Sequence, residues 1–313
     1  MMKKRKRLWI VLGVVIVLCI GACAGIVALV SLASGRGMGL AEAVAIVRVE
    51  GVILSGSPPV SPFDGGGGAY SDRIVEYLER AQEDSSVKAI VLRVNSPGGS
   101  VVASDEIYQQ MLEVKKPIVV SMGELAASGG YYIAAPADLI MANPATLTGS
   151  IGVITQVPNL EELLEKIGVE VVVIKSGIHK DEGSPFREMT EEEQAIWQAI
   201  IDEAYGQFVA IVAEGRDLPE EKAREMADGR VYTGKQAMEL GLVDELGNLP
   251  EAIDRAAELG GIEGEPRLVE YHRPPTLFES FFGSLVSPFQ PFDLARLLDL
   301  EGRPSLQYLY VEP

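Results

Sequence analysis

A serine surrounded by small residues is the first candidate for chemistry. Ser128 lies in the stretch AASGGYY, residues 126–132, directly after a predicted strand. At a strand-to-helix turn, a serine hydroxyl faces a cleft and the next backbone N–H points to the same place, as in a nucleophile elbow. The stretch lacks the G-x-S-x-G sequence of that elbow, and a serine at this position can instead cap the following helix. Both interpretations stay open from this segment alone.

A second candidate is the glycine-rich turn NSPGGS, residues 95–100, between a predicted buried strand and a helix. Paired glycines let the backbone turn sharply and point N–H groups at an anion, either a phosphate or a developing oxyanion. The alternative is an ordinary tight turn, for which glycine is the usual residue. The G-x-x-x-x-G-K-[ST] spacing of a phosphate loop is missing, which counts against a phosphate.

A serine nucleophile needs a base, and the segment Lys175–Asp181 contains both usual kinds. His179 is one of only two histidines in the chain, and histidine is the commonest partner of a catalytic serine. Lysine is the other choice, as in Ser–Lys dyads. A lysine in water has a pKa near 10.4 and is only about 0.1% neutral at pH 7.4. Burial can lower a lysine pKa by about 3–5 units, so a lysine base requires an apolar, closed site.

Alternating strands and helices must position these residues. Strands are predicted at residues 43–53, 88–94, 117–122, 139–142, 151–155 and 169–174. These segments are rich in Val, Ile and Leu, and most are separated by segments with helical periodicity, including residues 160–167. Strands that alternate with helices predict an α/β fold with largely parallel pairing.

The second half of the chain is predicted to be more helical. A polar loop, residues 175–187, precedes a long helix that starts at Thr190 with a capping box and runs to about Gly215. From Gly260 onward the pattern thins, and prolines and phenylalanines indicate an irregular tail. The terminal LQYLYV, Leu306–Val311, is predicted to form a strand that adds to a sheet edge of this chain or of a neighbouring copy.

The N-terminus carries a membrane signal. Residues 8–35 contain no charged side chain, and five basic residues, Lys3–Arg7, precede them. About 20 apolar residues span a bilayer as a helix, and the basic cluster should stay in the cytoplasm, which puts the body on the outer side. A cleaved secretory signal, with Ser31–Ala33 as its cleavage site, and a lipoprotein box ending at Cys23 are the alternatives. All three interpretations place the chain after the apolar run outside the cytoplasm.

Composition excludes several classes of function. The formal net charge is −18, although the N-terminal cluster is basic. A body this acidic repels phosphate backbones, which argues against nucleic acid as a partner. The two cysteines, Cys19 and Cys23, both lie in the apolar run. The rest of the chain therefore has no disulfide and no cysteine metal site.

Five strings in register resemble a known family. They are NSPGG, SMGELAASGGYYIA, TGSIGVI, IKSGIHKDEGSPFREMT and DGRVYTGKQAMELGLVDELG, within Val44–Asn248. Together they are similar to the bacterial and archaeal signal peptide peptidase of the SppA type. The resemblance implies a membrane-bound serine peptidase with an α/β fold, a Clp protease/crotonase-like spiral of ββα units, preceded here by one N-terminal transmembrane helix.

The resemblance also implies roles for individual residues. Ser128 would be the nucleophile and Lys180 the general base, with Ser150 helping to hold the lysine. His179 would then be only a neighbour of the base. No metal, nucleotide or other cofactor is implied. A Ser–Lys dyad fits a chain in which histidine is scarce.

The oxyanion hole would consist of backbone N–H groups from two glycine-rich turns. Gly98 or Gly99 would supply one donor and Gly129, the residue after the nucleophile, the other. Such donors stabilise the charge that develops on the carbonyl oxygen during acyl transfer. The reaction would be cleavage of unfolded peptides, with remnant signal peptides as the substrate class of the family.

The expected organisation follows from these observations. The segments are a cytoplasmic basic segment (1–7), a transmembrane anchor (8–33), a linker (34–42), the peptidase domain (43–260) and a C-terminal extension (261–313). The protein is expected at the plasma membrane as a single-pass protein with its catalytic domain outside the cytoplasm. Because each motif occurs once, the chain resembles the short family form, a homo-oligomeric ring in which neighbouring protomers share active sites.

Two other functions stay open. A crotonase-like enzyme on the same fold would use the paired N–H groups to hold a thioester enolate of CoA, without a Ser–Lys dyad. A non-catalytic, membrane-anchored ring could bind peptides or recruit partners, and replacing Ser128 or Lys180 would leave its function intact.

Overall fold

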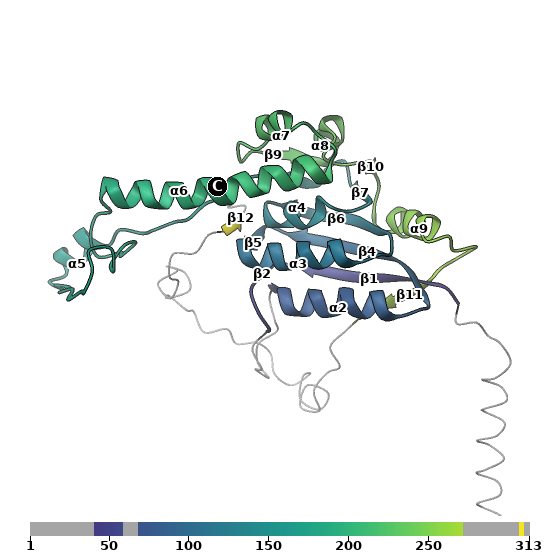
Figure 1. Ribbon diagram of the computed structural model, residues 1–313, viewed down its shortest axis with the longest axis horizontal. Coiled ribbons are helices and arrows are strands. Elements are labelled where there is room, and N and C mark those ends of the chain that lie inside the picture. The colour runs from purple at the N-terminus through teal and green to yellow at the C-terminus, as the bar shows by residue number, and fades with distance from the viewer. Residues whose placement is uncertain (1–40, 59–67, 272–306, 310–313) are drawn as a thin grey trace, which may run out of the picture. The chain divides into compact units, whose positions relative to one another are not determined.

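A mostly parallel sheet forms the centre of the computed structural model, which describes residues 41–58, 68–271 and 307–309 (Figure 1). The strand order is β10-β7-β6-β4-β1-β11, and all of these neighbours pair in parallel. The first half of β6 pairs with β7, and its C-terminal end pairs in parallel with β8. Strand β8 in turn pairs antiparallel with β9. The strands are β1 (Ala43–Glu50), β4 (Val87–Ser96), β6 (Ile118–Ala127), β7 (Leu139–Ala142), β8 (Leu147–Gly149), β9 (Val231–Thr233), β10 (Glu245–Leu246) and β11 (Arg267–Glu270).

A smaller sheet contains the glycine-rich turn. Its order is β12-β5-β2-β3, with parallel pairs β2–β3 and β2–β5 and an antiparallel pair β12–β5. The strands are β2 (Val52–Leu54), β3 (Gly68–Tyr70), β5 (Gly98–Ser100) and β12 (Gln307–Leu309). The predicted terminal strand is confirmed at its centre, and it pairs with the turn itself.

Both faces of the central sheet are buried. Alternate residues of β1 enter different cores: Ala45 and Val47 belong to the larger one, and Val44 and Ile46 to the smaller one. Helices α2 (Ser71–Glu83), α3 (Val101–Glu113) and α4 (Gly129–Ala134) contribute to the larger core, and α9 (Leu249–Leu259) to the smaller. Parallel sheets covered on both faces have strands that are apolar throughout. The predicted α/β class is therefore confirmed.

The long predicted helix is also confirmed. Helix α6 spans Glu191–Gly215, and Thr190 caps it. The Glu193 N–H donates to Thr190 Oγ1 at 3.2 Å, and the Thr190 N–H donates to Glu193 Oε2 at 2.9 Å, which completes the capping box. The remaining helices are α5 (Glu161–Lys166), α7 (Glu220–Met226) and α8 (Gly234–Leu240).

Two predicted strands are wrong. Residues 151–155 make only an isolated bridge, between Ile154 and Gln307. Residues 169–174 form no strand, and their apolar side chains are exposed: Val172 is 75% and Ile174 96% accessible. A β-branched run forms a strand only where a sheet edge and a buried face receive it. Among the residues that the structure describes, neither is present for residues 169–174.

The predicted transmembrane anchor, residues 8–33, lies outside the described residues. Among the described helices, none is both long and apolar enough to cross a bilayer.

Candidate active site

Ser128 lies at the junction of β6 and α4 in a strained conformation. Its φ is 53° and its ψ is −118°, and it occupies the position before the first residue of α4. Positive φ is uncommon for a residue with a Cβ, and such strain concentrates at functional sites. The Ser128 side chain makes no capping hydrogen bond, so the helix-cap interpretation is wrong. Only 1% of the residue is accessible.

The two glycine-rich turns meet beside Ser128. A Cβ placed on Gly98 would lie 2.6 Å from the Gly129 nitrogen. A Cβ on Gly129 would lie 3.2 Å from both the Cα of Gly98 and the nitrogen of Gly99. Side chains are therefore excluded at Gly98 and Gly129, and the backbones of the two turns lie close together.

Two buried serines, which sequence reasoning missed, organise this approach. The Gly98 N–H donates to Ser96 Oγ at 3.0 Å, so that donor is already used. Ser104 donates to the Ser100 carbonyl at 2.9 Å, and its Oγ lies 2.6 Å from where a Cβ of Gly129 would be. Neither contact follows from sequence spacing, because each depends on how the turn packs against α3 and α4.

Ser150 lies next to Ser128 through the backbone. The Ser128 N–H donates to the carbonyl of Gly149 at 2.7 Å, and the Ser150 N–H donates to the carbonyl of Arg230 at 2.8 Å. Like Ser128, Ser150 has a positive φ, 48°. It lines a pocket of about 480 Å³ between residues 150–154, α6 and residues 227–229. The structure thus places Ser150 directly after the residue whose carbonyl accepts from Ser128.

Lys180 is not brought to Ser128 within this chain. It lies in the arm, which we define as residues 169–190, beyond the N-terminal end of α6 and apart from α4 (Figure 1). Residues 169–180 are all exposed, and His179 is among them. Neither proposed base therefore contacts the serine of its own chain.

A strand of the same chain lies along the glycine turn. In the antiparallel pairing of β12 with β5, Tyr308 is opposite Gly99 and Leu309 opposite Gly98. On its other edge, Gln307 exchanges two backbone hydrogen bonds with Ile154, each 3.1 Å long. The Tyr308 carbonyl oxygen and the Gly129 nitrogen both lie within 2.6 Å of the position that a Cβ of Gly98 would take. An extended peptide thus fits this groove, with a carbonyl beside Gly129.

The ring of Tyr308 fills an aromatic pocket that sequence reasoning did not identify. Its centroid lies 4.8 Å from that of Tyr132, stacked, and 4.7 Å from that of Phe208. Its hydroxyl donates to the carbonyl of Ala204 at 3.0 Å, and the residue is fully buried. Burial raises the pKa of Tyr308 and of Tyr132 well above the usual range, so both stay neutral.

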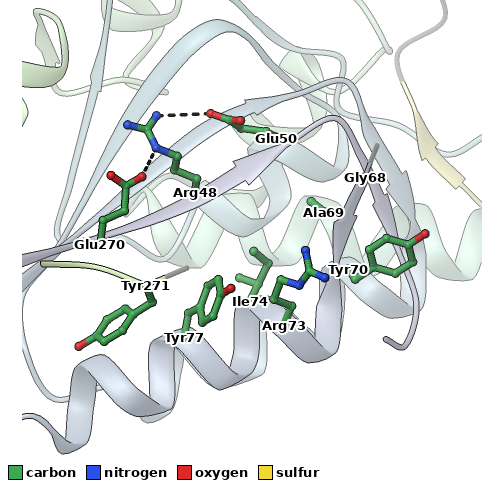
Figure 2. A pocket seen from close by; sticks show the side chains of 10 residues that line it. All are labelled: Arg48, Glu50, Gly68, Ala69, Tyr70, Arg73, Ile74, Tyr77, Glu270 and Tyr271. Atoms are coloured by element: carbon green, nitrogen blue, oxygen red, sulfur yellow. Dashed lines mark hydrogen bonds and ion pairs between the residues drawn. The ribbon is translucent and has the colours of Figure 1, made fainter. Parts of the chain in front are cut away.

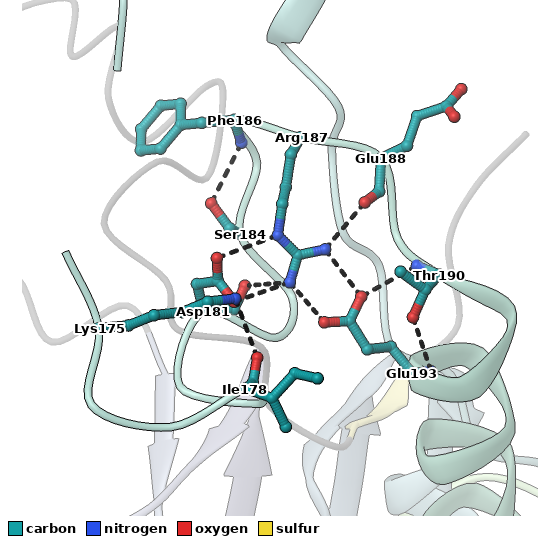
Figure 3. A network of polar contacts seen from close by, with 9 residues as sticks. All are labelled: Lys175, Ile178, Asp181, Ser184, Phe186, Arg187, Glu188, Thr190 and Glu193. Atoms are coloured by element: carbon teal, nitrogen blue, oxygen red, sulfur yellow. Dashed lines mark hydrogen bonds and ion pairs between the residues drawn. The ribbon is translucent and has the colours of Figure 1, made fainter. Parts of the chain in front are cut away.

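A charged network joins the arm to the start of α6 (Figure 3). The guanidinium of Arg187 lies between the carboxylates of Asp181 and Glu193, and Lys175 also contacts Asp181. Hydrogen bonds from Arg187 hold the pKa of Glu193 at about 2 and that of Asp181 below its usual range. Sequence analysis identified the capping box at Thr190 but not this network.

A separate pocket of about 330 Å³ lies among β1, β3, α2 and residues 270–271 (Figure 2). Arg48 reaches into its upper rim, where its guanidinium contacts Glu50 at 3.4 Å and Glu270. None of the predicted catalytic residues lines this pocket. It therefore does not belong to the candidate site.

Two family profiles match the chain. Peptidase family S49 matches residues 110–263, which include Ser128, Ser150 and Lys180. The Clp protease family matches residues 68–147, which include the glycine turn and Ser128.

Several curated proteins are similar. A provisionally named protease of Synechocystis sp., slr0021, is 54% identical over 58% of this chain and 66% of its own length. Protease 4 of Haemophilus influenzae is 41% identical over 69% of this chain and 34% of its own. A protein of Enterococcus faecium, provisionally named signal peptide peptidase SppA, is 42% identical over 68% of this chain and 63% of its own. The chain thus spans about one third to two thirds of the length of these relatives.

Proposed function

Because the chain belongs to peptidase family S49, we propose that it is a serine endopeptidase that cleaves extended peptides through an acyl-enzyme on Ser128. One observation carries the proposal. Ser128 is held at positive φ where two side-chain-free turns meet, and a peptide strand, β12, lies along one of them. This is the arrangement that acyl transfer needs: a nucleophile, N–H donors and a bound carbonyl.

The proposed reaction uses a Ser–Lys dyad. Neutral Lys180 accepts the proton of Ser128 Oγ while that oxygen attacks the substrate carbonyl carbon. The C–N bond then breaks as the lysine donates the proton to the leaving amine, and an ester to Ser128 remains. Water, deprotonated by the same lysine, hydrolyses the ester. Ser150, close to Ser128 in the fold, would hold the lysine amine in place.

The oxyanion donors would be the N–H groups of Gly99 and Gly129. Both glycines line the meeting point of the turns, and the Gly98 N–H already donates to Ser96. The pairing of Tyr308 with Gly99, and its carbonyl near Gly129, support this choice, because a substrate strand along β5 would bring a carbonyl close to both donors.

The base would come from a neighbouring copy of the chain. In its own chain, Lys180 lies on the exposed arm, whose apolar side chains include Ile174 and Ile178, 96% and 71% accessible. Apolar exposure of this extent indicates an interface. The pocket beside Ser150 carries Asp202 and Asp228, whose carboxylates would attract the ammonium of a neighbour's Lys180. Repetition of this contact would close a ring with shared active sites.

We also propose a substrate class and a cellular location for the protein. The relative from Enterococcus faecium carries the provisional name of a signal peptide peptidase, and the groove accepts a peptide as a strand. We propose cleaved signal peptides and other unfolded segments as substrates. Residues 8–33 would anchor the chain in the plasma membrane, with residues 1–7 in the cytoplasm and the peptidase domain outside it.

A set of three substitutions tests the proposal. The full-length protein in detergent is assayed on an unstructured apolar peptide, together with Ser128→Ala, Lys180→Ala and His179→Ala. We expect wild type and His179→Ala to cut, and the other two to lose at least about 100-fold in kcat, the lower range for a general base. If Lys180→Ala cuts and His179→Ala does not, the base is wrong. An assembled wild-type protein that cuts no peptide would favour a non-catalytic scaffold.

A further inference from the structure

Asp181, the residue directly after the proposed base, is held by two cations (Figure 3). Arg187 Nε donates to Asp181 Oδ2 at 3.1 Å, and Arg187 Nη2 donates to Oδ1 at 2.9 Å and to the backbone carbonyl at 3.1 Å. Lys175 Nζ donates to the same Oδ1 at 2.6 Å. Only 10% of the Asp181 side chain is accessible. The backbone next to Lys180 is therefore fixed by side-chain contacts.

Arg187 joins this carboxylate to the start of α6. Its Nη1 donates to Glu193 Oε2 at 2.8 Å, and its Nη2 contacts Glu193 Oε1. Glu193, 5% accessible, lies in the first turn of α6 and also closes the capping box with Thr190. A planar guanidinium can bind two carboxylates with paired hydrogen bonds, which a lysine cannot do. Arg187 thus connects the loop with the base to a rigid helix end.

The loop needs such a connection. Residues 169–180 are exposed and belong to no helix or strand, so little else in the described chain orders them. A segment with few buried contacts opens easily, whereas a catalytic group must be held within about 0.5 Å of its productive place. The two cations of the network, Lys175 and Arg187, balance the charge of the two carboxylates. The carboxylate of Asp181 is thus already bound and does not pair with the ammonium of Lys180.

We propose that Arg187 is a positioning residue, which docks the loop of Lys180 onto α6 and thereby presents the lysine to Ser128 of a neighbouring copy. The proposal rests on the proposed peptidase function. It predicts that removal of Arg187 slows the chemical step and leaves peptide binding intact, because the groove along β5 contains no part of the network.

The test compares Arg187→Gln and Arg187→Lys with a matched control, Arg255→Gln. Arg255 also bridges two carboxylates, those of Glu245 and Glu258, but on α9. With the full-length protein, we expect kcat to fall about 100-fold in both Arg187 variants, the effect of roughly 1 Å of misplacement, with KM within about twofold. Arg255→Gln should behave as wild type. Covalent labelling of Ser128 by a fluorophosphonate should slow in parallel, and millimolar guanidinium should partly restore Arg187→Gln.

The outcomes separate the two proposals. A wild-type protein that cleaves, with an assembled Arg187→Gln variant within about threefold of its kcat, overturns the assignment of Arg187 but not the peptidase. Loss of assembly in light scattering together with loss of activity would also overturn it, because Arg187 would then act on the oligomer. A wild-type protein that neither cleaves peptides nor labels at Ser128 refutes the proposed function itself.

Discussion

The substitution Gly98→Ala tests the groove along β5, in which β12 lies and in which we propose that substrates bind. The new Cβ would lie 2.0 Å from the Tyr308 carbonyl oxygen and 2.6 Å from the Gly129 nitrogen, both backbone atoms that have no rotamer to change. The turns must therefore separate by about 1 Å, and a misplacement of this size costs about 100-fold in rate. Loss of an oxyanion donor costs about 10²–10³-fold in kcat. We expect kcat/KM for a peptide to fall by about 10²–10³-fold.

The same substitution also strains the backbone, which a control can separate. Gly98 has a φ of +97°, and an L-residue there loses about 1–2 kcal/mol of stability. Gly264 has a φ of +86° but nothing within 4 Å of its Cβ position. Gly264→Ala should therefore lose similar stability in urea unfolding and keep wild-type activity. A folded Gly98→Ala variant with activity within about threefold of Gly264→Ala would refute the placement of the carbonyl.

Three further predictions follow from the tail and the arm. Deletion of residues 307–313 should lower the KM for an added peptide by about tenfold, because a tethered strand competes at millimolar effective concentration; an unchanged KM would contradict this. Arg187 depresses the pKa of Asp181 and holds that of Glu193 at about 2, so their stabilisation is present above about pH 4 and is lost as the pH falls toward 2. Urea unfolding from pH 2 to 5 should show this loss in wild type and a weaker one in Arg187→Gln, and equal slopes would argue against the network. Thr190→Ala should lower the free energy of unfolding by about 1 kcal/mol through loss of the cap, and a change below about 0.3 kcal/mol would indicate that the cap is not formed.

The central sheet could be predicted because its signal is local. β1, β4 and β6 each contain a run of consecutive apolar residues, which is typical of strands buried on both faces. The start of α6 was also predictable, since the Thr190–Glu193 capping box is a contact between residues three apart. In both cases the residues that form the element also carry the evidence for it.

The arm could not be predicted in the same way. Residues 169–174 have the composition of a strand, but β-propensity reports fit to a pleated, half-buried surface rather than a backbone preference. No sheet edge in the described part of the chain receives them, and their side chains are exposed. If the arm packs against a neighbouring copy, as we propose, one sequence contains only half of the contact.

The candidate site likewise contains residues that could be predicted from the sequence and residues that could not. Ser128 and the glycine turn carry local signals, a strand-to-helix junction and paired glycines. The aromatic pocket of Tyr308 and the contact of Arg187 with Asp181 depend on packing between distant or irregular segments, for which sequence spacing has no signature. The position of β12 on β5 was only partly predictable: the strand had a signal, but its pairing partner did not.

Complementation between two inactive variants tests whether neighbouring copies share a Ser–Lys site. Ser128→Ala retains Lys180, and Lys180→Ala retains Ser128, so each alone should be inactive. Unfolded together and refolded as a mixture, they should regain about a quarter of wild-type activity, the share of sites that pair an intact serine with an intact lysine in a random ring. Activity in Lys180→Ala alone, or none in a mixture shown to co-assemble, would refute a shared Ser–Lys site.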